Sequence, residues 1–245
     1  MNASRTLATA HRVLLQLRHD PRTIALMLAV PCVLITLLKY VFDSTPQVFD
    51  RIGAPMLGVF PMLVMFVVTA VATLRERTGG TLERLLAMPL GKLDLLAGYA
   101  LAFGLVALVQ GVLAFALTIG LLGLNVAGPS WALLAVAVAD GLLGMAMGLL
   151  VSAFAATEFQ AVQFLPAFLL PQLLLCGLFT PRASMAGWLH AVSDALPLSY
   201  AVDAMNDITT HAGFAGATLI DLLIVLGSTV LALTLGAATL RRRTA

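Results

Sequence analysis

The chain has 245 residues, of which 60% are hydrophobic and only 11% are charged. Soluble domains carry about 25% charged residues, so this composition excludes an ordinary soluble domain and indicates a polytopic membrane protein. The formal net charge of +2 is too small to indicate a nucleic-acid partner. Cys32 and Cys176 lie inside apolar runs and predict neither a disulfide nor a metal framework.

The N-terminal segment, 1–21, predicts an amphipathic helix that lies on the cytoplasmic membrane surface. Two stripes repeat there at helical spacing. The apolar stripe holds Leu7, Ala10, Leu14 and Leu17, and the polar stripe holds Arg5, Thr9, Arg12, Gln16 and His19. The arginines suit an anionic membrane surface, and Asp20-Pro21 ends the helix. A soluble helix is the alternative, but no soluble core is available to cover its apolar stripe.

Long apolar runs predict an all-α fold with six transmembrane helices, since one crossing needs about 20 apolar residues. No charged residue occurs from 95 to 139, and the turn-forming sequence NVAGPS at 125–130 divides this run into two crossings. We therefore expect crossings at 23–42, 52–74, 95–124, 131–157, 159–180 and 222–240. Lys39 lies close enough to the far end of the first crossing to reach the interface.

The distribution of basic residues predicts that both termini are cytoplasmic. With the N-terminus inside, eleven of the 14 Lys and Arg residues fall on the inner side. These are Arg5, Arg12, Arg18, Arg22, Arg75, Arg77, Arg84, Lys92, Arg241, Arg242 and Arg243. Three others, Lys39, Arg51 and Arg182, fall outside. The chain then reads as one membrane domain over 1–245, divided into 1–21, 22–74, 75–94, 95–180, 181–221 and 222–245.

The cytoplasmic segment 75–94, RERTGGTLERLLAMPLGKLD, predicts a short coupling helix. Thr81 can cap it, and Pro89 and Gly91 end it. One face carries Leu82, Leu85, Leu86 and Pro89, while Glu83 and Arg84 lie on another and are available to a partner. The alternative for Glu83 and Arg84 is an ordinary solvated helix face.

The long outer segment, 181–221, predicts a helix that dips into the outer leaflet. Met185, Trp188, Leu189, Val192 and Leu196 share its apolar face, and Pro181 and Pro197 bracket it. We expect Asp194, Asp203 and Asp207 to remain in external water.

Motifs for catalysis or nucleotide binding are absent from the sequence. The phosphate-binding motif GxxxxGK[ST] is missing. Gly91-Lys92 is followed by Leu93 rather than by Ser or Thr, and Leu86 occupies the position where the motif requires its first glycine. The four histidines are scattered, and neither GxSxG nor HExxH occurs. We therefore expect a chain that is not an enzyme and that carries no metal or other cofactor.

Two stretches carry a resemblance to a known family. Residues 75–97, RERTGGTLERLLAMPLGKLDLLA, resemble the cytoplasmic loop of type-2 ATP-binding-cassette permeases. Residues 178–203, LFTPRASMAGWLHAVSDALPLSYAVD, resemble the outer segment of the same family. The six-crossing plan covers essentially the whole chain, and the bacterial drug-efflux branch, which includes daunorubicin-resistance permeases, is the most similar. The chain departs from the family's cytoplasmic-loop pattern at two points. It has Gly79-Gly80 where a single glycine is usual, and Thr78 where Glu or Lys is frequent.

The resemblance implies the permease of an exporter in the bacterial inner membrane. In such exporters two permease subunits, identical or different, pair with two ATPase subunits, which hold ATP and magnesium. The cargo would be hydrophobic or amphipathic drugs, antibiotics or lipids. Thr81, Glu83, Arg84 and Leu86 would then couple this chain to the ATPase, and the amphipathic N-terminal helix would dock on it too.

Five residues are candidates for a substrate pathway. Asp140 falls near the centre of the bilayer, where a carboxylate is costly, and small residues such as Gly141 and Gly144 surround it. It is either a hydrogen-bonded packing residue or a residue linked to substrate or protons. The family resemblance places the second and fifth crossings at the dimer axis. There Phe60, Phe66, Phe164 and Phe168 could line an apolar cavity or pack against neighbours and lipid.

Two other functions stay open. A proton-coupled secondary transporter could use Asp140, although no clear internal repeat is present. An intramembrane aspartyl protease could pair Asp140 with Asp221, although Asp221 falls at the membrane edge and the sequence around Asp140 lacks a GxGD-type motif.

Overall fold

The structure is a computed structural model that describes residues 2–79, 91–213 and 216–239. All regular secondary structure in these ranges is helical, which confirms the all-α prediction. The helices are α1 (Ala3–Arg18), α2 (Pro21–Val41), α3 (Pro46–Thr78), α5 (Lys92–Phe115), α6 (Ser130–Ser152), α7 (Glu158–Leu175), α8 (Gly187–Asp194), α9 (Pro197–Thr210) and α10 (Gly216–Thr239). A π-helical turn at Ala116–Leu121 continues α5, and a 3-10 turn at Arg182–Ser184 precedes α8.

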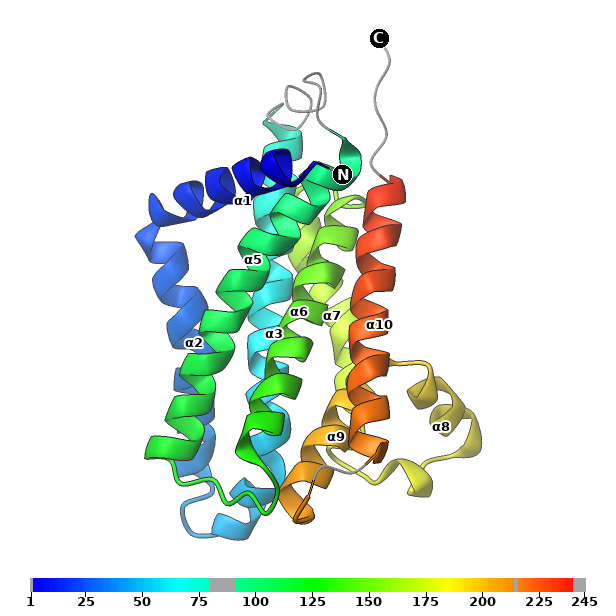
Figure 1. Ribbon diagram of the computed structural model, residues 1–245. Helices are drawn as coiled ribbons and strands as arrows, with labels where there is room; N and C mark the ends of the chain where they lie inside the picture. Colours follow the sequence, from blue (N-terminus) through cyan, green and yellow to red (C-terminus); the bar gives the residue numbers. More distant parts are fainter. Residues whose placement is uncertain (1, 80–90, 214–215, 240–245) are drawn as a thin grey trace.

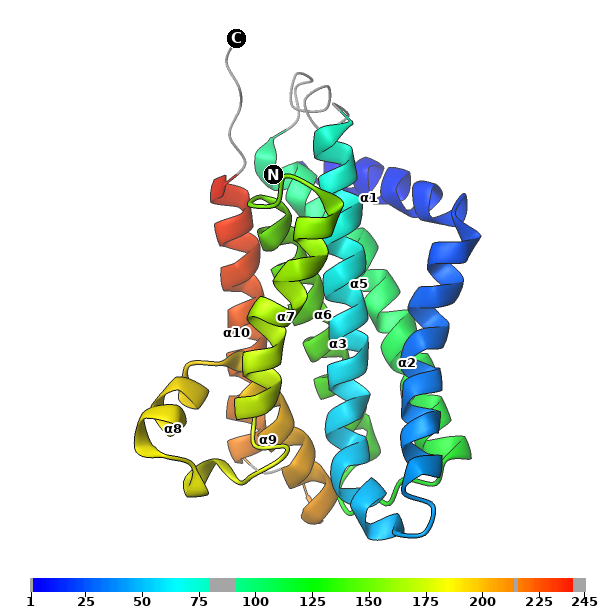
Figure 2. The same cartoon turned by 180° about the vertical axis from the view of Figure 1, so that it is seen from behind.

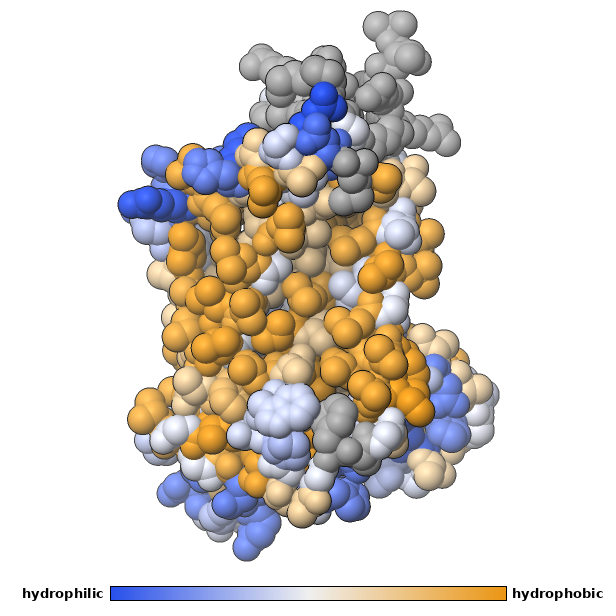
Figure 3. Space-filling view, in the orientation of Figure 1, coloured by the Kyte–Doolittle hydropathy of each residue, from blue (hydrophilic) through white to orange (hydrophobic). Residues whose placement is uncertain are grey.

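Six of the described helices are long and apolar enough to cross a membrane, as predicted. They are α2, α3, α5 with its π-helical turn, α6, α7 and α10, and they run side by side as a bundle (Figure 1). Hydrophobic side chains cover the middle of the molecule, and hydrophilic ones gather at its two ends (Figure 3). We call these the α1 end and the α9 end.

The centre of the bundle is the pair α3 and α6, which are the most buried of the six helices. Two glycines of α6 bring the helices together: a side chain at Gly144 would meet the backbone of Met62, and one at Gly148 would meet the Phe66 carbonyl. Small residues at such points allow close backbone approach without a hydrophobic driving force. On one face of this pair, α7 lies beside α3 (Figure 2).

Several predicted helix ends were displaced. Thr157, which we expected to end the fourth crossing, instead caps α7 by accepting a hydrogen bond from the Gln160 backbone N–H at 3.2 Å. α7 ends before Gly177, whose φ of 91° is a left-handed conformation that suits glycine. Asp221, placed outside the sixth crossing from the sequence, lies within α10.

The N-terminal helix α1 lies across one end of the bundle (Figure 1), and most of its predicted apolar stripe packs against the bundle. Ala10 is buried and Leu14 and Leu17 are partly buried, whereas Leu7 is 62% exposed. Thr9, predicted on the polar stripe, is buried as well, because it packs on Gly98 of α5, where a Cβ would lie 2.5 Å from the Thr9 Cβ. α1 therefore packs its small polar residues against α5.

At the α9 end, the helix predicted between Pro181 and Pro197 is present as α8, Gly187–Asp194, and a second helix, α9, follows it. α9, which was not predicted, buries Leu198, Val202, Met205 and Ile208. Of the three aspartates expected in external water, Asp194 is 50% exposed, Asp203 is 41% exposed and Asp207 is 27% exposed. Asp194 and Asp203 both pair with Arg182, while Asp207 contacts His211 and accepts a hydrogen bond from Thr218.

Candidate functional site

The predicted coupling residues Thr81, Glu83, Arg84 and Leu86 lie outside the described residues. The structure does describe both flanks of that segment, namely the last turn of α3 and the first turn of α5. α3 has 33 residues and is therefore about 50 Å long, whereas the hydrocarbon layer is about 30 Å thick. Its charged end can therefore project beyond the apolar band at the α1 end.

Three consecutive charged residues at this end of α3 contact different elements. Successive helical residues point about 100° apart, so Arg75, Glu76 and Arg77 diverge. Arg75 donates to Glu158 at the start of α7, with its Nε 2.7 Å and its Nη2 2.9 Å from the two carboxylate oxygens. Arg77 donates to the Ser152 carbonyl at the end of α6. The end of α3 is thus joined to α6 and α7.

Glu76 connects α3 to α1 and α5. Arg12 of α1 places its Nη1 and Nη2 3.3 and 3.0 Å from the two carboxylate oxygens of Glu76. Tyr99 of α5 donates its hydroxyl to the same carboxylate and accepts from Arg12 Nη2 at 2.9 Å. The Glu76 side chain is only 14% exposed, so water competes little for these bonds. We call Arg12, Glu76 and Tyr99 the Glu76 cluster.

The first turn of α5, on the other side of segment 80–90, is also bonded to the start of α1. Asp94 in the first turn of α5 is buried, and its Oδ1 accepts the Asn2 backbone N–H at 2.8 Å. α1 is consequently bonded to the helix before segment 80–90 and to the helix after it. A displacement of either flank would therefore be passed to α1, and through Arg75 and Arg77 to α7 and α6.

Sequence reasoning did not single out the Glu76 cluster. The available signal was the run of three charges directly after an apolar crossing. The partners could not be identified, because Arg12 and Tyr99 are distant from Glu76 in the sequence. Glu158, in the first turn of α7, is the partner of Arg75.

The predicted pathway residues are only partly brought together. On α7, Phe164 and Phe168 stack at an angle, with ring centroids 5.7 Å apart. Phe66 is fully buried and Phe60 is partly buried in the core of the bundle, while Phe168 is 48% exposed. In this conformation Phe60 and Phe66 pack in the core, and the role of the four phenylalanines in a substrate pathway stays a prediction.

Asp140, a residue of α6, lies buried against α3 and α9. Its side chain is near Gly58 and Met205, because a Cβ at Gly58 would be 2.8 Å from Asp140 Oδ2 and 2.7 Å from the Met205 methyl group. Neither carboxylate oxygen has a hydrogen-bond partner among the described residues. Asp140 is therefore a buried polar group whose hydrogen-bonding capacity is unused in this conformation.

Comparison with known proteins decides the family. Residues 5–209 match the family described as "ABC-2 type transporter". The chain belongs to the ABC-2 type transporter family. The match includes the Glu76 cluster, both flanks of segment 80–90 and α9 up to Thr209, and it confirms the family, though not the branch, of the resemblance drawn from two short stretches. This ABC-2 permease is therefore a multi-pass membrane protein and a transport component.

Curated relatives have similar descriptions. The permease is 30% identical over 144 residues to the probable multidrug ABC transporter permease YbhR of Escherichia coli, covering 59% of this chain and 39% of that protein. It is 31% identical over 155 residues to the inner membrane transport permease YhhJ of E. coli, covering 62% and 41%. ABC transporter G family member 20 of Dictyostelium discoideum is 29% identical over 143 residues, covering 58% and 19%. The chain thus matches about two fifths of the length of its E. coli relatives.

Proposed function

We propose that this ABC-2 permease is the membrane-spanning subunit of an ATP-driven exporter of hydrophobic or amphipathic compounds. The observation that carries the proposal is the family match over residues 5–209. Two relatives, described as a probable multidrug permease and an inner membrane transport permease, support drug efflux across a bacterial inner membrane. ATP and magnesium would be held by two copies of a partner ATPase.

Segment 80–90 is proposed to be the point of contact with the ATPase. Its two flanks are bonded to α1, α6 and α7 through the Glu76 cluster, Arg75, Arg77 and Asp94, so a push on the segment would reach three other elements. In this arrangement α1 is the interfacial helix on the cytoplasmic side. Both termini are then cytoplasmic, and α8 lies at the outer surface.

A second permease copy, identical or different, would complete the pathway. Exposed apolar residues of α7, namely Phe159, Val162, Phe168, Leu170 and Leu174, offer surface for this contact as well as for lipid. Phe60, Phe66, Phe164 and Phe168 remain the proposed apolar lining.

A proton-coupled secondary transporter is the second candidate. The observation in its favour is Asp140, because a buried carboxyl group without a hydrogen-bond partner is the kind of group that proton-coupled carriers use. The packing role and the proton role of Asp140 therefore both stay open to experiment.

The variant Glu83→Ala tests the coupling proposal. We expect it to abolish efflux, while expression, membrane insertion and co-purification with the ATPase stay close to wild type. Asp43→Ala is the matched control, since Asp43 is an exposed carboxylate at the opposite end of the bundle and should leave efflux unchanged. Wild-type efflux in Glu83→Ala would remove Glu83 from the coupling contact.

A further inference from the structure

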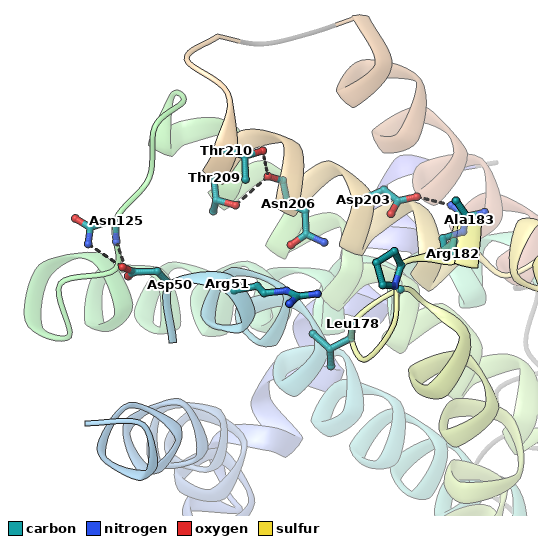
Figure 4. A pocket seen from close by; sticks show the side chains of 12 residues that line it. Asp50, Arg51, Asn125, Leu178, Arg182, Ala183, Asp203, Asn206, Thr209 and Thr210 are labelled. Carbon is teal, nitrogen blue, oxygen red and sulfur yellow. Dashed lines mark hydrogen bonds and ion pairs between the residues drawn. The ribbon is translucent and has the colours of Figure 1, made fainter. Parts of the chain in front are cut away.

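A cavity of about 650 Å³ lies at the α9 end, remote from the Glu76 cluster. Four stretches of the chain enclose it: Asp50 and Arg51 of α3, Asn125 before α6, the segment 177–183 after α7, and one face of α9 (Figure 4). Ligand pockets commonly measure about 300–1,000 Å³, so the volume suits a small molecule or a head group.

The acidic groups at this cavity are already engaged. Asp50 accepts hydrogen bonds from the Asn125 backbone N–H at 3.3 Å and from the Asn125 side-chain amide at 3.0 Å. Asp203 accepts from Arg182 Nη1, and the same guanidinium reaches Asp194 with Nη2. Burial raises the pKa of Asp203, and the ion pair with Arg182 offsets only part of that effect. Both carboxylates of the lining therefore have hydrogen-bond partners, and that of Asp203 is also paired with a positive charge.

Two donor groups at the cavity are unused. Arg51 is exposed and has no hydrogen bond or ion pair to any residue that the structure describes. Asn206 uses its backbone carbonyl to accept from Thr209 and Thr210, but no described residue bonds to its side-chain amide. Figure 4 shows Arg51 extending from α3 and Asn206 extending from α9 toward the same space. In addition, the buried Nε of Arg182 has no partner among the described residues.

We propose that this cavity binds the anionic head group of an amphipathic molecule, with Arg51 as the charged donor and Asn206 as a second donor. A guanidinium can donate two parallel hydrogen bonds to a phosphate or a carboxylate. These bonds are stronger than those that the same guanidinium makes to a neutral group, so an anionic head group is favoured over a neutral one. A cationic head group would be repelled by the guanidinium of Arg51, which has no described partner.

The surroundings favour an amphiphile over a free ion. Leu178 and Pro181 form part of the wall, and the neighbouring Phe179 is 63% exposed on the same segment. An alkyl chain could leave the cavity along this segment toward the apolar band, while the head group remains with Arg51. Neither the family match nor the relatives' descriptions assign such a site, and binding there requires no ATP.

Direct binding tests the proposal. The purified protein in phosphatidylcholine nanodiscs is titrated with dodecyl phosphate by calorimetry, with empty nanodiscs as the blank for partitioning. Loss of one charge-assisted hydrogen-bonding group should weaken binding about tenfold in Arg51→Gln. Arg51→Lys keeps the charge but not the paired donors, so it should lose affinity, though less than Arg51→Gln, and Asn206→Ala should lose about threefold to tenfold. Arg18→Gln is the matched control, because Arg18 is also exposed but lies on α1.

Two further ligands identify what the cavity recognises. Dodecyltrimethylammonium has the same alkyl chain with the opposite charge and should bind much more weakly than dodecyl phosphate. Inorganic phosphate, the free-ion alternative, should not displace dodecyl phosphate at equal concentration. Unchanged affinity in Arg51→Gln, preference for the ammonium compound, or equal displacement by inorganic phosphate would each overturn the proposal. Because the titration contains neither ATP nor ATPase, its failure would leave the proposed export function untouched.

Discussion

At the scale of single residues, some charged side chains near the ends of the bundle are paired and others have no described partner. At the α1 end, Arg75, Glu76 and Arg77 are all bonded to other elements. At the α9 end, Arg182 is paired twice while Arg51 has no described partner. Paired charges hold elements together, whereas an unpaired exposed arginine is available to a ligand.

The Arg12 to Glu76 bond should contribute measurably to stability. Both side chains are mostly buried, so we expect a double-mutant cycle of Arg12→Gln and Glu76→Gln to give a coupling energy of about 1–2 kcal/mol. The cycle is measured by denaturant unfolding of the purified protein in detergent.

The Arg75 to Glu158 pair is the matched control for that cycle. Its geometry is as good, but its side chains are 61% and 52% exposed, so water screens the attraction. The corresponding cycle of Arg75→Gln and Glu158→Gln should give a coupling energy of no more than about 0.5 kcal/mol. Equal coupling in the two cycles would contradict the assignment of the Glu76 cluster as the stronger link.

At the scale of elements, the contact between α3 and α6 depends on two glycines. At Gly148 an added Cβ would meet the Phe66 carbonyl and lie 3.1 Å from the Ala70 nitrogen, and backbone atoms cannot move aside as a side chain can. The two helices would have to separate. Gly148→Ala should therefore destabilise the protein by about 1–3 kcal/mol, as measured by thermal unfolding in detergent.

Gly227→Ala is the comparison for that variant. Gly227 lies in α10, where an added Cβ meets nothing within 4 Å. Alanine is a better helix former than glycine, so this substitution should leave stability unchanged or raise it by about 0.5–1 kcal/mol. A Gly148→Ala protein as stable as Gly227→Ala would mean that α3 and α6 do not approach as closely as described.

Helix α9 shows where sequence reasoning stopped. Leu198, Val202 and Met205 repeat at helical spacing, but we expected Asp203 and Asp207 to remain in external water and predicted no helix there. The carboxylates are compatible with a partly buried helix because Arg182 and Thr218, both distant in sequence, satisfy them. A pattern along the chain cannot show which distant residue will pair with a charge, so both α9 and the Glu76 cluster went unrecognised.

At the scale of the whole molecule, the number of crossings was the easiest feature to predict. A membrane requires each crossing to satisfy its backbone internally and to present apolar side chains, so long apolar runs reveal the helices directly. The ends of those helices were less predictable, because they depend on local caps such as Thr157. The roles of segment 80–90 and of Asp140 remain predictions.

Sidedness can be tested by labelling in intact cells. In a background of Cys32→Ser and Cys176→Ala, a membrane-impermeant maleimide should label Ala186→Cys, at the start of α8, because we place it outside. It should label Ala8→Cys, at an exposed position of α1, only after the cells are broken. Labelling of Ala8→Cys in intact cells would reverse the proposed orientation.

The central proposal is that ATP hydrolysis by a partner drives transport through this permease. It is tested most directly by following uptake of a fluorescent drug into inside-out vesicles from native cells. We expect uptake in wild-type vesicles to require ATP, to persist when a protonophore collapses the proton gradient, and to be lost in Glu83→Ala vesicles. Uptake that runs on a proton gradient without ATP, and that disappears in Asp140→Asn, would contradict the account and favour the proton-coupled transporter.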